Sequence, residues 1–322
     1  MTNFPQSVIE ALISTLDRYY VIPEITSKIA SSLRAKASTG KFDLMSDFKD
    51  FATALNNDLL QESRDKHLRI RYNPGEMDES DEDMDTTLTP EMLNQIRKDT
   101  EYKNFGFYKV ERLDGNIGYM DIRSFVPTEV AGETAVAAMN FLANTYCLII
   151  DLRKNYGGVP SMVDLICGYL FRPSVHLNSL YWRKNDTVEQ YWSLPYVPGK
   201  HYGNKPVYVL TSNDTFSGGE EFAYVLQQRN RVIIVGERTK GGANPGMVIR
   251  ITPEFEAFIP MGRAIHPLTG TNWEGVGVQP DVETVGDNAF QVAYRKALSH
   301  IVDDFSLPEF VRSEAHQVLK SC

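Results

Sequence analysis

A small hydroxyl followed by two glycines stands where a helix is expected to begin. The segment TFSGGEEFAYVLQ (215–227) carries apolar residues at helical spacing, yet Ser217 precedes Gly218 and Gly219, and helices avoid glycine. The glycines allow a sharp turn from strand to helix, which would expose Ser217 beside uncommitted N–H groups, including that of Gly218, that can bind an oxyanion. The pattern predicts a nucleophile, although the GxSxG spacing of a nucleophile elbow is absent. An N-cap serine is the commoner alternative for this segment alone.

A nucleophilic serine needs a base, and the base needs an orienting acid. Among six histidines, His67 in RDKHLRIRY and His266 in GRAIHPLTG rank first, and the residues alone do not separate them. A lone histidine is more often structural than catalytic. Glu274 lies in the glycine-rich segment NWEGVGVQPD and is a candidate acid; a solvent-facing loop acid is the alternative.

Two kinds of pattern indicate the elements that would position these side chains. Residues 1–74 repeat apolar residues at helical intervals and predict a small helical bundle, followed by an acidic linker over 75–100 that contains EMDESDEDMD. From 101 to 322, strands alternate with helices, as in YCLIIDLRKNYGG and PVYVLTS before the serine segment. The fold class expected is therefore α/β (α+β).

Composition excludes several classes of function. The net charge of −9 argues against nucleic acid and anionic membranes as partners. The sequence contains no run of about 18 apolar residues, so no membrane span is expected. The N-terminal segment lacks the basic region that is typical of a signal peptide. Cys147 and Cys167 sit in apolar runs, which indicates buried free thiols, and with Cys322 they make an odd number without metal-ligand spacing. A reducing, cytoplasmic location is expected.

Four segments in order resemble the tail-specific (C-terminal processing) protease family, in its branch with tricorn cores and interphotoreceptor retinoid-binding protein modules. They are DKHLRI, DLRKNYGG, TSNDTFSGGEEFAY with VGERTKGGA, and WEGVGVQPD. VIEALISTLDRYYVIPE and NFGFYKVERLDGNIGYMDI resemble the retinoid-binding-type modules, so the resemblance covers nearly the whole chain. It implies a small helical bundle followed by a crotonase-like ββα-spiral domain.

The resemblance also implies a role for each candidate residue. Ser217 matches the nucleophile, His67 the base and Glu274 the acid of the tricorn-like branch, which chooses His67 over His266. The N–H of Gly218 matches one oxyanion donor, and the pair Gly157 and Gly158 matches the other. The implied activity is a serine-type peptidase acting on peptides or proteins, with no metal or cofactor. Relatives often assemble, so a homo-oligomer is compatible with the resemblance.

Two residues depart from the family patterns. The bacterial and chloroplast enzymes use a lysine base at the position of Gly242, and Lys240 is two residues out of register. Lys66 stands where tricorn cores carry a second serine, and a cation beside the base would lower its pKa.

A carrier of apolar ligands is the alternative function, because the retinoid-binding relatives use the same fold without proteolysis. The stretch YWRKNDTVEQYWSLPYVPG could line an apolar pocket, or it could pack between sheet and loop; its aromatic residues are Tyr181, Trp182, Tyr191, Trp192 and Tyr196. Retention of Ser217, His67 and Glu274 favours the enzyme.

Overall fold

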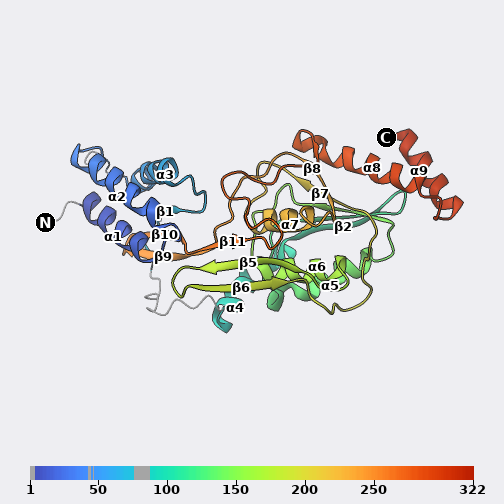
Figure 1. Cartoon of the computed structure of the whole chain (residues 1–322), viewed down its shortest axis with the longest axis horizontal. Coiled ribbons are helices and arrows are strands. Elements are labelled where there is room, and N and C mark those ends of the chain that lie inside the picture. The colour runs from blue at the N-terminus through green and yellow to red at the C-terminus, as the bar shows by residue number, and fades with distance from the viewer. Residues whose placement is uncertain (1–3, 43–44, 46, 76–87) are drawn as a thin grey trace. The chain divides into compact units, whose positions relative to one another are not determined.

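A computed structural model describes residues 4–42, 45, 47–75 and 88–322 of the chain (Figure 1). These residues divide into two compact units, each assembled from separate stretches of sequence. Unit 1 comprises 1–87, 179–189 and 244–265, and unit 2 comprises 88–178, 190–243 and 266–322. The result is a mixed α/β fold with an N-terminal helical region and a central mixed sheet, which confirms the predicted fold class.

Three helices open unit 1, as the helical periodicity predicts: α1 (Phe4–Tyr19), α2 (Pro23–Ser38) and α3 (Phe48–Ser63). The start of α3 is fixed by Asp47, whose side chain accepts hydrogen bonds from the N–H groups of Lys49 and Asp50. Its end is fixed by Arg64, which adopts the left-handed conformation with φ 58°. This cap turns the chain into the segment that carries His67.

A three-stranded antiparallel sheet completes the core of unit 1. Its order is β1–β10–β9, with bounds β1 (Arg69–Tyr72), β9 (Gly246–Thr252) and β10 (Phe255–Pro260). Phe255, at the start of β10, is fully buried, and its ring packs edge-on against Phe51 of α3 with the centroids 5.7 Å apart. The N-terminal helices therefore share one apolar core with strands that arrive almost 200 residues later.

A second small sheet has the order β11–β5–β6. Its strands are β5 (His176–Trp182), β6 (Thr187–Trp192) and β11 (Gly262–Ile265). Within unit 1, β11 pairs antiparallel with β5, from Gly262 opposite Trp182 to Ile265 opposite Ser179. The unit boundaries fall inside β5 and β6, so each of these strands contributes residues to both units.

Unit 2 is built on a six-stranded sheet with the order β12–β8–β7–β4–β3–β2. Neighbouring strands are parallel except β2, which pairs antiparallel with β3 across the turn at Gly115. The strands β3, β4 and β7 are buried along their whole length, as is typical of parallel strands that are covered on both faces. The bounds are β2 (Phe107–Leu113), β3 (Ile117–Ile122), β4 (Cys147–Asp151), β7 (Val207–Thr211), β8 (Ile233–Gly236) and β12 (Val282–Glu283).

Helices cover this sheet. Ile149 and Leu210 point into a core shared with α8, while α5 packs against β2 and β3, and α6 packs against both α5 and α7. The helical bounds are α4 (Pro90–Glu101), η1 (Asn104–Gly106), α5 (Thr128–Leu142), α6 (Pro160–Leu170), α7 (Gly218–Gln227), η2 (Gly286–Asn288), α8 (Ala289–Asp303) and α9 (Glu309–Ser321).

Several smaller expectations meet the structure here. Cys147 and Cys167 are buried and unbonded, which confirms the prediction of free thiols, and Cys322 is exposed. Of the predicted acidic linker, residues 76–87 lie outside the described residues, and 90–101 forms α4. Across the described ranges, every helix is too short or too polar to cross a lipid bilayer.

Candidate active site

Ser217 occupies the N-cap position of α7, directly after the loop that follows β7. Its backbone has φ 55° and ψ −121°, a conformation that residues with a side chain rarely adopt. Such strained positions cluster at active sites because the surrounding structure must hold them in place. The structure thus gives Ser217 a conformation that an ordinary capping serine does not need.

The glycine loop after β4 is fixed by a buried asparagine. Asn155 is fully buried; its Nδ2 donates to the Ile122 carbonyl (3.0 Å), and its own carbonyl accepts from the N–H of Phe216 (3.0 Å). Its Oδ1 accepts from the N–H of Gly157 at 2.8 Å. Asn155 therefore ties the glycine loop both to the end of β3 and to the residue before Ser217.

Gly157 and Gly158 lie against the serine turn. A Cβ atom on Gly157, which has φ 100°, would stand 2.7 Å from the Ser217 Cβ and 2.8 Å from the Gly218 nitrogen. A Cβ on Gly158, with φ 141°, would stand 2.0 Å from the Phe125 carbonyl oxygen. Both positions require glycine, because any side chain would collide with backbone.

The N–H groups of this loop differ in what they bind. Gly157 donates to Asn155, as described above. Within the described part of the chain, the N–H groups of Gly158 and Gly218 have no protein acceptor. Unit 2 alone thus brings together a strained serine and two N–H groups that have no acceptor among the described residues.

Glu220 is a functional candidate that the sequence analysis missed. Its side chain is fully buried and accepts from the N–H of Ser217 (2.9 Å), from the N–H of Gly242 (2.8 Å), and from the Thr239 hydroxyl and the Gly241 N–H. Burial raises the pKa of Glu220, and these donors act in the opposite direction. The S-x-x-E spacing of a capping box was the signal in the sequence. Glu220 thus joins the serine turn to residues 239–242.

Glu274 is positioned by the same framework within unit 2. The Trp273 indole N–H donates to the Gly242 carbonyl at 2.8 Å, and the Gly275 N–H donates to the Gly241 carbonyl at 3.2 Å. The Glu274 carboxylate accepts from the N–H of Ala243. A continuous set of hydrogen bonds therefore runs from Ser217 through Glu220 and residues 241–243 to Glu274.

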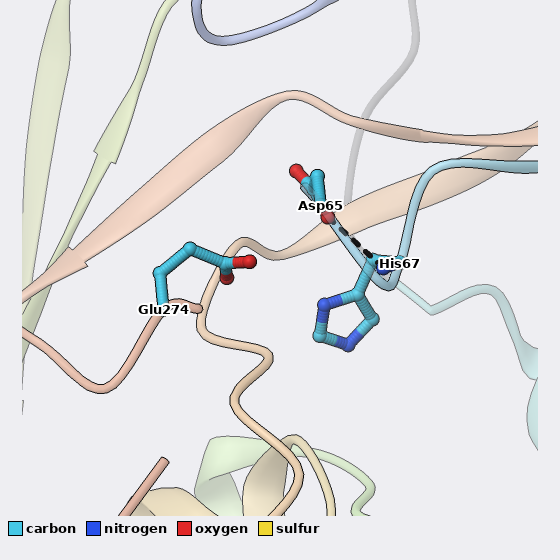
Figure 2. Close-up of side chains that lie close together, drawn as sticks. All are labelled: Asp65, His67 and Glu274. Carbon is cyan, nitrogen blue, oxygen red and sulfur yellow. Dashed lines mark hydrogen bonds between the residues drawn. The ribbon is translucent and has the colours of Figure 1, made fainter. Parts of the chain in front are cut away.

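His67 lies in unit 1, at the turn between α3 and β1. The Asp65 carboxylate accepts from the backbone N–H of His67 at 2.9 Å, as Figure 2 shows, and also from the Asn244 amide at 3.0 Å. The His67 ring stacks on Phe258 of β10, with ring centroids 5.6 Å apart. In the D-x-H pattern, Asp65 thus holds the backbone of the histidine turn.

Burial and a neighbouring cation favour the neutral form of His67. Burial, together with the positive charge of Arg69, lowers the pKa of His67 to about 4. The imidazole is therefore neutral at neutral pH and can accept a proton.

The competing histidine and lysine have other surroundings. His266 is fully buried in unit 2, and its ring meets Tyr224 of α7 edge-on, with centroids 5.3 Å apart. Burial, then the charges of Arg229 and His176, lower its pKa to about 4. The Lys240 ammonium lies over the Phe216 ring, 5.3 Å from its centroid, and Lys66 is exposed.

The aromatic stretch 181–196 takes part in packing. Trp182 contacts the apolar core of unit 1. In unit 2, Trp192 stacks on His176 with centroids 4.8 Å apart, and Tyr196 is exposed.

Comparison with known protein families identifies the group to which this chain belongs. The family model for peptidase family S41 matches residues 116–284, more than half of the chain and most of unit 2. The chain is a member of peptidase family S41. A second model, the N-terminal domain of this family in eukaryotic interphotoreceptor retinoid-binding protein, matches residues 2–105. The family resemblance inferred from the sequence motifs is thereby confirmed, and membership supports a serine peptidase.

Solved structures share the fold at low sequence identity. A putative peptidase from Parabacteroides merdae is 17% identical, with a TM-score of 0.63 over 91% of this chain and 96% of that one. The photosystem II D1 C-terminal processing protease is 13% identical, with a TM-score of 0.51 over 89% and 94%. The tricorn protease is 15% identical, with a TM-score of 0.55 over 90% of this chain and 35% of that one.

Proposed function

We propose that this S41 family member hydrolyses peptide bonds with Ser217 as nucleophile, His67 as general base and Glu274 as the acid that orients and charge-balances the imidazole. Ser217 attacks the peptide carbonyl carbon while His67 takes the hydroxyl proton, and a tetrahedral intermediate forms. When the intermediate collapses, His67 returns that proton to the leaving amine, and an acyl-enzyme remains for water to hydrolyse. The reaction as proposed uses no metal or cofactor.

The observation that carries the proposal is the serine turn of unit 2. Ser217 has the strained backbone of a held nucleophile, and the N–H groups of Gly158 and Gly218 lie beside it without a protein acceptor among the described residues. These two N–H groups are the proposed oxyanion donors, and Gly157 contributes by leaving room for them. The loss of one such donor typically costs about 10²–10³ in kcat.

The proposal requires the two units to act together. Ser217 and Glu274 belong to unit 2, whereas His67 belongs to unit 1. The neutral state of His67 and the fixing of its backbone by Asp65 support its role as base. We propose that the productive arrangement forms when the units place the His67 ring within hydrogen-bond reach of Ser217.

A fluorophosphonate probe tests the nucleophile and the base directly, because the probe reacts with an activated serine. The wild-type protein is expected to be labelled, and Ser217→Ala and His67→Ala are expected to lose labelling. His266→Gln, which changes the competing histidine, is expected to retain it. Thermal unfolding of each variant shows whether the protein is folded.

Two results would refute the assignment. Labelling that persists in folded Ser217→Ala would show that another residue is the nucleophile. Labelling that is lost in folded His266→Gln but kept in His67→Ala would show that His266, and not His67, is the base. A folded wild-type protein that is never labelled but binds a retinoid or fatty acid would favour the carrier function.

A further inference from the structure

Strand β2 forms one edge of the six-stranded sheet of unit 2. Among the described residues it pairs with β3 alone, so the backbone groups on its other side have no strand partner. An open edge of this kind can pair with an additional strand. The edge is also rich in exposed side chains: Tyr108 is 65% exposed, and the side chains of Lys109 and Glu111 are 52% and 40% exposed.

A shallow apolar groove runs beside this edge. It has a volume of about 500 Å³ and lies between β2 and α5, with Val110, Ala137 and Phe141 among its lining residues. Phe141 is 61% exposed. Apolar surface next to an open strand edge can be buried when a further strand pairs there.

We propose that the free edge of β2 pairs antiparallel with the same edge of a second copy of this chain. Lys109 and Glu111 form an ion pair within one chain, and the same two charges can also pair between two copies. If the two-fold axis passes through Val110, Lys109 of each copy lies directly opposite Glu111 of the other, on the same sheet face. Cross-strand pairs of opposite charge stabilise a sheet, and like charges directly opposite destabilise it.

The neighbouring registers do not share this complementarity. A shift that centres the pair on Glu111 places two carboxylates opposite each other, and a shift that centres it on Lys109 places two ammonium groups opposite each other. A register that places Val110 of one copy opposite Glu111 of the other sets peptide groups that point outward against peptide groups that point inward. The Val110 register is therefore the one in which both the backbone and the charges match.

The same register also joins the apolar surfaces. Val110 meets its own copy on the face that carries α5, so the grooves of the two copies become continuous. Their Phe141 side chains then lie on the same face of the joined sheet. Burial of this surface would add hydrophobic stabilisation to the strand pairing. The inference is independent of the Ser217 site.

The test measures molecular mass in solution by analytical ultracentrifugation. At about 100 µM, where a complex with a micromolar Kd is almost fully formed, the wild-type protein is expected at twice the monomer mass of 36.4 kDa. Lys109→Glu and Glu111→Lys are each expected to sediment as monomers, because every cross-strand pair then joins like charges. Lys296→Glu, an exposed charge reversal on α8, is the matched control and keeps the dimer.

Mixing the two edge variants separates pairing between copies from effects inside one chain. One variant carries two carboxylates on the edge and the other two ammonium groups, so an equimolar mixture is expected to regain the dimer mass. Repulsion within a chain would not be relieved by mixing. A monomeric wild type, dimeric single variants, or a mixture that stays monomeric would each overturn the proposal. Both positions are exposed, so thermal unfolding should remain close to that of the wild type.

Discussion

At the scale of single residues, the packed helices α6 and α7 carry carboxyl groups whose protonated form is favoured by burial. Glu221 follows Glu220 on α7 and is buried; burial raises its pKa to about 7, with the Asn178 amide acting in the opposite direction. Asp164 on α6 has its pKa raised to about 8, first by burial and then by the charge of Glu221. These carboxyls are therefore partly protonated at neutral pH.

This pair predicts that the protein loses stability as the pH rises. A folded-state pKa above the unfolded value means that the folded protein holds protons that the unfolded chain releases, so the free energy of unfolding falls between about pH 4 and pH 8. Each group contributes at most about 1.4 kcal/mol per pH unit. Asp164→Asn, which cannot ionise, should raise the free energy of unfolding near about pH 8 and change it little near about pH 4. Urea unfolding at the two pH values measures the difference.

The opposite slope, or an Asp164→Asn variant that is destabilised equally at both pH values, would show that Asp164 is ionised and stabilising in the folded protein. Asp303→Asn, at an exposed position on α8, provides a control without burial.

At the scale of elements, the proposed site depends on a loop framework more than on the helix that carries the serine. Glu220 accepts hydrogen bonds from four donors that belong to the serine turn and to residues 239–242. That segment in turn holds the loop of Glu274 through Trp273 and Ala243. A substitution at Glu220 should therefore disturb the positions of both Ser217 and Glu274.

Glu220→Gln is expected to reduce fluorophosphonate labelling at least about tenfold and to lower the free energy of unfolding by about 1–3 kcal/mol. The glutamine amide has the same shape as the carboxylate, but one of its two acceptor oxygens is replaced by an NH₂ donor. This donor then lies against backbone N–H groups that need an acceptor. Labelling kinetics and urea unfolding measure the two effects. Glu221→Gln is the matched control, because the Asn178 amide, which donates to the Glu221 carboxylate, can still donate to the remaining carbonyl. Equal labelling by Glu220→Gln and the wild type would remove Glu220 from the site.

The elements also show what local sequence patterns can and cannot predict. Uninterrupted apolar runs correctly indicated β4 and β7, and helical periodicity indicated α1, α2 and α3. The β5–β6 hairpin was missed because its aromatic residues follow neither period. Glu220 was overlooked even though its spacing from Ser217 is that of a capping box. The pairing of β1 with β10 joins residues almost 190 positions apart, which no local pattern encodes.

At the scale of the whole molecule, the sequence predicted a bundle at 1–74, whereas unit 1 also includes 179–189 and 244–265. The reason lies in the core: the first three helices leave an apolar face that strands β9 and β10 cover. The sequence therefore predicts where the N-terminal helices lie, but their apolar core is completed by strands from much later in the chain.

Phe255→Ala tests this dependence. Phe255 is fully buried against Phe51 and Phe48, so its truncation should lower the free energy of unfolding by about 3–5 kcal/mol. Helical circular dichroism during urea unfolding reports the loss. Phe305→Ala, at a side chain that is 82% exposed, should change stability by less than about 0.5 kcal/mol. A loss near zero for Phe255→Ala would mean that the helices are stable without β10.

The chain passes from one unit to the other five times between residues 87 and 266. A single crossover anywhere in that part of the coding sequence would leave both units without a piece of their interior. One crossover in this part of the coding sequence can therefore not exchange a whole unit and leave the other intact.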